Sequence, residues 1–247
     1  MPQITHILFD CDNTLVLSED LAFEACAEVA NQVLQAHDIP DRYTGPQLIT
    51  DFVGMNFRGM LKALSEKFNL TISPEDEEAY VKQEEDQVIA TLSAKAQPCV
   101  NVDPELESLA KEKKYKLAVV SSSAKRRVVA CLQKVGQDKF FPDEVVFSAA
   151  TSLEKPTSKP DPAIYLHACE KLDTEPGMCV AVEDSASGTK SAVKAGIPTI
   201  GYVGSYHGEE MQEKMGKALL EHGAKNIMVD WTEFRNKLAE IENGARL

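Results

Sequence analysis

The sequence predicts an α/β protein with a doubly wound, mainly parallel sheet and a small, separate helical domain. Three observations predict it. Short continuous apolar runs recur along the chain, segments of helical pattern lie between them, and one long helical stretch without such runs follows the first run. Short apolar runs suit strands buried on both faces of a parallel sheet. Their alternation with helices is typical of a doubly wound fold.

The apolar runs and the segments between them give the expected strands and helices of the main domain. The six expected strands are residues 5–9, 117–120, 144–147, 178–182, 198–203 and 226–229. The expected helices are residues 104–113, 124–135, 161–172, 185–195 and 208–222. Pro104 and Pro162 lie near helix starts, where a missing N–H costs little. Gly196 and Pro198 end one helix and lead into the next strand.

Residues 17–96 break this alternation, and we expect them to form a helical cap domain. Residues 1–16 and 97–247 are then the α/β catalytic core. The expected cap helices are residues 19–38, 57–68 and 74–93, separated by Pro40, Gly45-Pro46 and Ser73-Pro74. Ligands of open α/β sheets bind at the carboxyl ends of the strands. An insert after the first strand is therefore expected to lie there as a lid.

The composition is that of an ordinary globular protein and excludes several classes of function. Hydrophobic residues make up 43% and charged residues 26% of the chain. No apolar run approaches the roughly 20 residues that span a bilayer, and the first residues lack the pattern of a secretory signal. The formal net charge of −13 disfavours nucleic acid and anionic membranes as partners. We expect a cytoplasmic protein, for which a monomer is plausible, with its six scattered cysteines reduced.

Polar side chains suited to phosphate chemistry follow four of the expected strands. The segments are Asp10-Cys11-Asp12-Asn13-Thr14, Ser121-Ser122-Ser123, Lys159-Pro160-Asp161-Pro162 and Glu183-Asp184. Taken alone, each segment could instead be a turn, a helix cap or a solvated surface residue without a functional role. However, adjacent acids after a buried strand are hard to explain by packing and suit a hard divalent cation. A hydroxyl before a helix N-terminus can hold a phosphoryl oxygen. Together the four segments predict a site for phosphate and metal.

In these motifs the sequence resembles the haloacid dehalogenase superfamily, in the branch with a helical cap after the first strand. The resemblance implies a Rossmann-like core and a phosphohydrolase. Asp10 would attack phosphorus to form an aspartyl-phosphate, and Asp12 would protonate the leaving alcohol and then activate water. The implied Mg²⁺ ligands are Asp10, the backbone carbonyl of Asp12, Glu183 and Asp184. The implied phosphate-binding residues are Ser121, Ser122 and Lys159.

The sequence departs from the family pattern in two places. Asn13 stands where Gly is commoner, and the segment between Ser121 and Lys159 is somewhat long, with residues 152–158 as the expected extra loop. Lys155 has a similar Lys-Pro setting. It is the weaker candidate for the motif lysine because it lies too far upstream of the following helix.

Other functions on this core remain as alternatives. Asp12 disfavours a dehalogenase, and no Schiff-base lysine of a phosphonate hydrolase is identifiable in the cap. A sugar-phosphate mutase of the β-phosphoglucomutase type shares the core motifs. Those enzymes carry a His where this chain has Ala22, and a cap Arg one place earlier than Arg58. A binding or regulatory protein on an inactive core is disfavoured by the intact motifs. We favour a phosphatase over the mutase.

The cap is expected to select the substrate. Asn56, Arg58 and Lys62 belong to the cap segment expected to face the active-site crevice, although Arg58 and Lys62 are equally compatible with a solvated helix face. A helical lid leaves room for a small phosphorylated metabolite, such as a sugar or polyol phosphate, and excludes a protein substrate.

Overall fold

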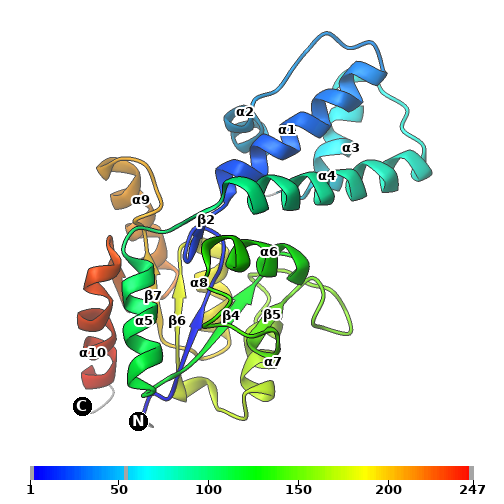
Figure 1. The fold of residues 1–247 in the computed structure, drawn as a ribbon. Coiled ribbons are helices and arrows are strands. Elements are labelled where there is room, and N and C mark those ends of the chain that lie inside the picture. The colour runs from blue at the N-terminus through cyan, green and yellow to red at the C-terminus, as the bar shows by residue number, and fades with distance from the viewer. Residues whose placement is uncertain (1–2, 53–54, 245–247) are drawn as a thin grey trace. The chain divides into compact units, whose positions relative to one another are not determined.

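The computed structural model of the chain describes residues 3–52 and 55–244 (Figure 1). The chain divides into two compact units. One consists of Met1–Leu17 and Gln97–Leu247, and the other consists of Ser18–Ala96. The first boundary lies one residue after the position expected from the sequence, and the second lies at that position.

A six-stranded parallel sheet forms the centre of the first unit and confirms the predicted fold class. Its strand order is β5-β4-β1-β6-β7-β8. The strands are β1 (His6–Phe9), β4 (Lys116–Ser121), β5 (Val146–Ser148), β6 (Cys179–Glu183), β7 (Thr199–Tyr202) and β8 (Asn226–Met228). The chain runs from β1 outward to β5 and then continues on the other side of β1. A strand order that reverses in this way places the ligand crevice at the carboxyl ends of β1 and β6.

The strand register brings the predicted site residues to one edge of this sheet. Phe9 of β1 pairs with Val119 of β4 and with Val182 of β6. The N–H of Asp10 donates to the carbonyl of Val182 at 3.0 Å. Every residue of β1 and β6 is buried, as expected for central strands covered on both faces. Asp10 and Glu183 therefore leave the sheet side by side.

Helices surround this sheet, and five of them match the predicted ones. They are α5 (Val102–Glu112), α6 (Lys125–Val135), α7 (Ala163–Lys171), α8 (Ala186–Lys194) and α9 (Glu209–Glu221). Three short 3-10 turns are η1 (Asp143–Val145), η2 (Pro176–Met178) and η3 (Trp231–Glu233). The turn η1 occupies the start of the strand predicted at residues 144–147, so that β5 begins two residues later.

The sequence reading missed a last helix, α10 (Phe234–Gly244). This helix buries Phe234, Leu238 and Ile241, whose helical spacing was the available signal. Trp231 lies before the helix with its ring centroid 5.5 Å from Phe234 and 5.9 Å from Phe9. These aromatic rings pack against the end of β1, directly before Asp10.

A short antiparallel ribbon joins the two connections to the second unit. It consists of β2 (Val16–Leu17) and β3 (Gln97–Pro98), with Val16 opposite Pro98 and Leu17 opposite Gln97. Two residues are too few for an alternating apolar pattern to be recognised, so the ribbon was not predicted. The segment between β2 and β3 therefore begins and ends at adjacent points of the first unit.

The described residues of the second unit form four helices. They are α1 (Glu19–Ala36), α2 (Gly45–Asp51), α3 (Phe57–Phe68) and α4 (Pro74–Lys95). Three were predicted, but α2 was not, because Gly45-Pro46 was interpreted only as a break. Pro46 instead occupies the first turn of α2, and the Thr44 side chain caps it by accepting the N–H of Gln47. Proline at the start of a helix replaces an N–H that has no partner within the helix.

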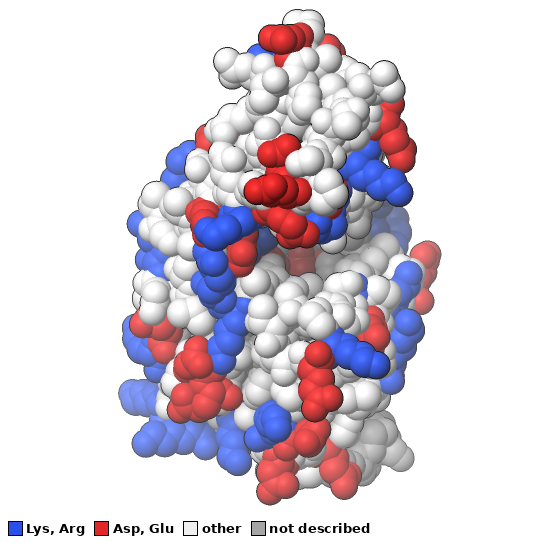
Figure 2. Space-filling view, turned by 90° about the vertical axis from the view of Figure 1, so that its right-hand side faces the viewer, with Lys and Arg blue, Asp and Glu red and all other residues white. Residues whose placement is uncertain are grey.

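The distribution of charge on the surface and the state of the cysteines can be compared with the sequence. On the face shown in Figure 2, acidic and basic side chains are interspersed. All six cysteines are buried free thiols. In the described part of the chain, no helix is both long enough and apolar enough to cross a membrane.

Candidate active site

Asp10 follows β1 and begins a tight turn. The carbonyl of Cys11 accepts the N–H groups of Leu15 and Val16 at 3.0 and 3.1 Å. Asn13 lies in the left-handed region, with φ of 56°. Asn adopts this conformation more readily than most residues other than Gly. The turn therefore accommodates Asn13 at the position where Gly is commoner in the family that the sequence resembles.

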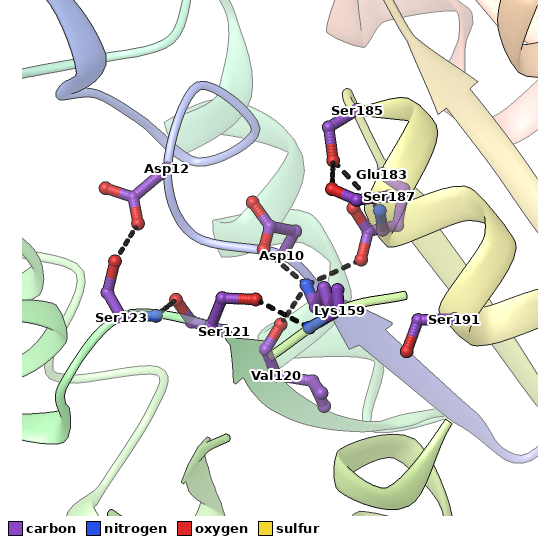
Figure 3. Close-up of polar contacts among 12 residues, drawn as sticks. Asp10, Asp12, Val120, Ser121, Ser123, Lys159, Glu183, Ser185, Ser187 and Ser191 are labelled. Atoms are coloured by element: carbon purple, nitrogen blue, oxygen red, sulfur yellow. Dashed lines mark hydrogen bonds and ion pairs between the residues drawn. The ribbon is translucent and has the colours of Figure 1, made fainter. Parts of the chain in front are cut away.

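The Lys159 ammonium lies between the carboxylates of Asp10 and Glu183 (Figure 3). Its Nζ is 2.6 Å from Oδ1 of Asp10 and 2.6 Å from Oε1 of Glu183. A third contact of 2.7 Å reaches the carbonyl of Val120. An ammonium has three donors, so these contacts use all of them. Lys159 is buried rather than solvated.

The burial of this cluster changes how its members bind protons. Burial raises the pKa of the Asp10 carboxyl to about 7, opposed by the charge of Lys159 and reinforced by Glu183 and Asp12. For Lys159, burial acts to lower the pKa, but attraction to Asp10 and Glu183 outweighs it and the pKa is raised. Lys159 therefore stays charged at neutral pH, whereas Asp10 without a further cation is partly protonated there.

The acid cluster has the charge and donor atoms of a divalent-cation site. Carboxylate oxygens of Asp10, Glu183 and Asp184 lie within 4.8 Å of one another, and all three residues are buried. Among the described residues of this cluster, three buried acids face the buried ammonium of Lys159, and uncompensated buried negative charge is costly. A hard cation with oxygen ligands, such as Mg²⁺, fits this donor set.

Helix capping does not account for the two adjacent acids. Ser185 is the N-cap of α8, and its Oγ accepts the N–H of Gly188 at 3.0 Å. Oε1 of Glu183 instead accepts a hydrogen bond from the hydroxyl of Tyr165, and the same oxygen accepts one from Lys159. Tyr165 was not among the predicted site residues. It lies in a helical pattern, where a buried aromatic residue indicates only the core.

The serines after β4 connect two loops of the site. Ser121 Oγ accepts the N–H of Ser123 at 3.0 Å, and Ser122 Oγ accepts the N–H of Lys159 at 3.2 Å. None of the three serines caps the following helix, α6: its N-cap residue is Ala124, and the N–H of Lys125 in its first turn is accepted by Thr151 Oγ1 at 3.2 Å. The first two serine hydroxyls therefore stabilise the loops that carry the candidate phosphate-binding groups.

The carboxylate of Asp12 points toward Ser123 and away from Lys159 (Figure 3). Its Oδ2 accepts the Ser123 hydroxyl at 2.7 Å, and its Oδ1 lies 3.0 Å from a guanidinium nitrogen of Arg127. Sequence reasoning missed Ser123 and Arg127 as members of the site. Arg127 is one of three consecutive basic residues at the start of α6, and nothing in that run distinguishes it.

The predicted cap residues belong to the second unit. Asn56 caps α3, with its Oδ1 accepting the N–H of Gly59 at 2.9 Å. Arg58 forms ion pairs with Glu77 and Glu78 of α4, the latter at 2.9 Å. Asn56, Arg58 and Lys62 line one hollow on the surface of this unit.

Comparison with known proteins gives a consistent assignment. Residues 4–196 match the family model of the haloacid dehalogenase-like hydrolases. A "Phosphorylated carbohydrates phosphatase" of Thermotoga maritima is 34% identical over 95% of this chain and 98% of its own length. The "6-phosphogluconate phosphatase" of Escherichia coli is 24% identical over 84% of this chain and 86% of its own. A solved structure from Thermotoga maritima, provisionally assigned as a β-phosphoglucomutase, is 30% identical, with a TM-score of 0.71 over 96% of this chain and 99% of that one.

Proposed function

The chain belongs to the haloacid dehalogenase-like hydrolases, as its four motifs predicted, and from this premise we propose that it is a magnesium-dependent phosphatase of a small phosphorylated carbohydrate. One observation carries the proposal. The buried carboxylate of Asp10 lies at the crevice edge of the sheet, beside a buried lysine and two further buried acids. In the proposed reaction this arrangement would supply a nucleophile, a cation for the phosphate and ligands for a metal.

In the proposed reaction, Asp10 attacks phosphorus in line with the leaving oxygen. A bond forms between its carboxylate and phosphorus while the ester P–O bond breaks, and water then hydrolyses the aspartyl-phosphate. Asp10, Glu183, Asp184 and the backbone carbonyl of Asp12 would hold Mg²⁺. When bound, this ion supplies positive charge that favours attack of one anion on another.

Lys159 would hold a phosphoryl oxygen, with help from the loop of Ser121 and Ser122. Because its three donors are all used, Lys159 must release one contact when phosphate binds. The contact with Asp10 is the one whose loss a bound cation would compensate. The same lysine then stabilises charge on the transferring group instead of on the nucleophile.

Asp12 would act as the general acid and then as the general base. Ser123 and Arg127 fix its carboxylate next to the start of α6. For proton transfer the side chain must reach the leaving oxygen, so we expect it to leave this position when substrate binds.

The substrate class rests on the relatives named as phosphatases of phosphorylated carbohydrates and of 6-phosphogluconate. The mutase remains the second candidate because one similar structure carries a provisional β-phosphoglucomutase assignment. Against it, α1 carries the small buried Ala22 where those enzymes have a proton-transferring His.

A panel of phosphorylated sugars, polyols and sugar acids, assayed for inorganic phosphate release and ranked by kcat/KM, tests the proposal. We expect one chemical class to be hydrolysed well above p-nitrophenyl phosphate. Turnover of a sugar 1-phosphate to its 6-phosphate isomer without phosphate release would instead establish the mutase. Phosphate release from none of the substrates would rule out the phosphatase.

Removal of divalent metal is expected to abolish activity. Treatment with EDTA should eliminate phosphate release, and added Mg²⁺ should restore it. Ca²⁺ should restore little, because its longer bonds and larger ligand number misplace the nucleophile. The measurement is the initial rate against metal concentration. Full activity of a preparation shown by elemental analysis to be metal-free would contradict the assignment of the acid cluster.

Arg58→Ala tests the role of the cap. If Arg58 contacts the leaving group, kcat/KM for the best metabolite should fall by about tenfold or more, the worth of a hydrogen bond to a charged group. The loss with p-nitrophenyl phosphate should be smaller, because that leaving group lacks the contact. Lys82→Ala is the control, since it also removes an exposed ion pair of α4, that with Asp86. Equal losses on both substrates would mean that Arg58 does not select the leaving group.

A further inference from the structure

A single oxygen of Glu183 receives two donors in the interior of the site. Oε1 accepts both Lys159 Nζ, at 2.6 Å, and the hydroxyl of Tyr165. The other oxygen, Oε2, is buried and has no hydrogen-bond partner among the residues that the structure describes. The carboxylate is therefore held from one side only.

Gly188 of α8 provides the space on the other side of this carboxylate. A Cβ at position 188 would lie 1.8 Å from Oε2 and 2.3 Å from the carboxyl carbon of Glu183. Any side chain there would displace the carboxylate. Tyr165 thus holds the carboxylate at Oε1, and the missing side chain at position 188 leaves the room that Oε2 occupies.

Tyr165 also contacts the neighbouring cation. It is fully buried, and the ammonium of Lys159 lies 5.3 Å from the centre of its ring. The ring thus contacts the candidate phosphate-binding residue, whereas the hydroxyl contacts the candidate metal ligand. Tyr165→Phe removes the hydroxyl and its contact with Glu183 but keeps the ring and its contact with Lys159, so the two contacts can be tested separately.

We propose that Tyr165 is a positioning residue for the metal site: its hydroxyl holds the Glu183 carboxylate in the orientation that it needs beside Asp10 and Asp184. The inference rests on the proposed metal dependence of the phosphatase and specifies which residue prepares the site. Partners of metal ligands typically change metal affinity by 10–100-fold when they are removed.

The test compares Tyr165→Phe with the wild type by titrating metal-free protein with Mn²⁺ and following the electron paramagnetic resonance of the free ion. Mn²⁺ is a spectroscopic substitute for Mg²⁺, and no substrate is needed. We expect the dissociation constant to rise by about tenfold or more. In assays the Mg²⁺ concentration for half-maximal rate should rise similarly, while kcat at saturating Mg²⁺ stays near that of the wild type.

Tyr115→Phe is the matched control. The Tyr115 hydroxyl also donates to a half-buried carboxylate, that of Glu242, at 2.8 Å. Tyr115 directly precedes β4, at the opposite end of the strand from Ser121. It should leave Mn²⁺ affinity unchanged. Gly188→Ala should weaken Mn²⁺ binding with Tyr165 intact, because it displaces the same carboxylate.

Unchanged Mn²⁺ affinity in Tyr165→Phe, with a lower melting temperature, would overturn the inference and make the hydroxyl a stabilising contact only. Weaker binding of inorganic phosphate with unchanged Mn²⁺ affinity would also overturn it, since Tyr165 would then act through Lys159. Both results would leave the phosphatase proposal standing. Absence of Mn²⁺ binding by the wild-type protein would overturn the inference together with the metal centre.

Discussion

Asp10→Asn is expected to reduce turnover by several orders of magnitude while the fold is retained. An amide is nearly isosteric with the carboxylate, but it is neither a good nucleophile nor an anionic ligand, so the covalent route is lost. The Asn carbonyl can still accept a hydrogen bond from Lys159, and Lys159 keeps its contacts with Glu183 and Val120. The measurement is kcat on the best substrate, with a thermal melt to show that the variant is folded.

The structure also predicts the direction of the stability change for this variant. Burial raises the pKa of Asp10 to about 7, so the charged carboxylate is disfavoured in the metal-free fold at high pH. A neutral amide removes this penalty, and above pH 7 the metal-free variant should be at least as stable as the wild type. Glu242→Gln is the control, because it removes a carboxylate paired with the exposed Lys114, away from the site. Near-wild-type turnover by Asp10→Asn would refute the assignment of the nucleophile.

Asp12→Ala should lower the rate by a factor on the order of 100 or more, the usual worth of general acid–base assistance. Affinity for Mg²⁺ should be nearly unchanged, because the backbone carbonyl proposed as a ligand remains. The loss should be greater for an alkyl phosphate than for p-nitrophenyl phosphate, whose leaving group needs little protonation. This order holds if departure of the leaving group limits the rate.

If hydrolysis of the aspartyl-phosphate is limiting, Asp12→Ala should slow both substrates alike and phosphoenzyme should accumulate. Ser123→Ala provides the control, since it removes a hydroxyl that contacts Asp12 but keeps the carboxylate. Its rate should stay well above that of Asp12→Ala. Wild-type turnover of an alkyl phosphate by Asp12→Ala, or loss of metal binding by the folded variant, would exclude the proposed division of roles.

The sheet was predictable because its strands are short apolar runs, and in the central strands β1 and β6 every residue is buried. Such strands are continuous apolar runs, and all six were recognised from the sequence. The elements that were missed lack this signal. The ribbon of β2 and β3 is too short to show a period, and α2 begins with Gly45-Pro46, a pair that more often marks a break. Helix α10 did carry an apolar spacing, at Phe234, Leu238 and Ile241.

The candidate site was predictable where its residues directly follow strands. The side chains that hold those residues in place were not. Tyr165 contacts Glu183 across 18 residues of sequence, and Arg127 contacts Asp12 across 115. Such pairs depend on how helices pack on the sheet, and neither helix carries a pattern that marks the residue. A polar group at a strand end is a local feature of the sequence, whereas its partner is a property of the fold.

The ribbon of β2 and β3 has a consequence for how this protein can change over evolution. Val16 faces Pro98 across the ribbon, so the inserted helical segment leaves and rejoins the core at neighbouring positions. For a flexible segment, the entropy of closing the loop grows only slowly with its length, and a segment with its own core also holds its two ends together. An insert of different size or sequence can therefore replace this one while the register of β1, β4 and β6 is kept. Under the proposed role of the insert, exchange of a module at this junction would change the specificity without rebuilding the proposed catalytic residues.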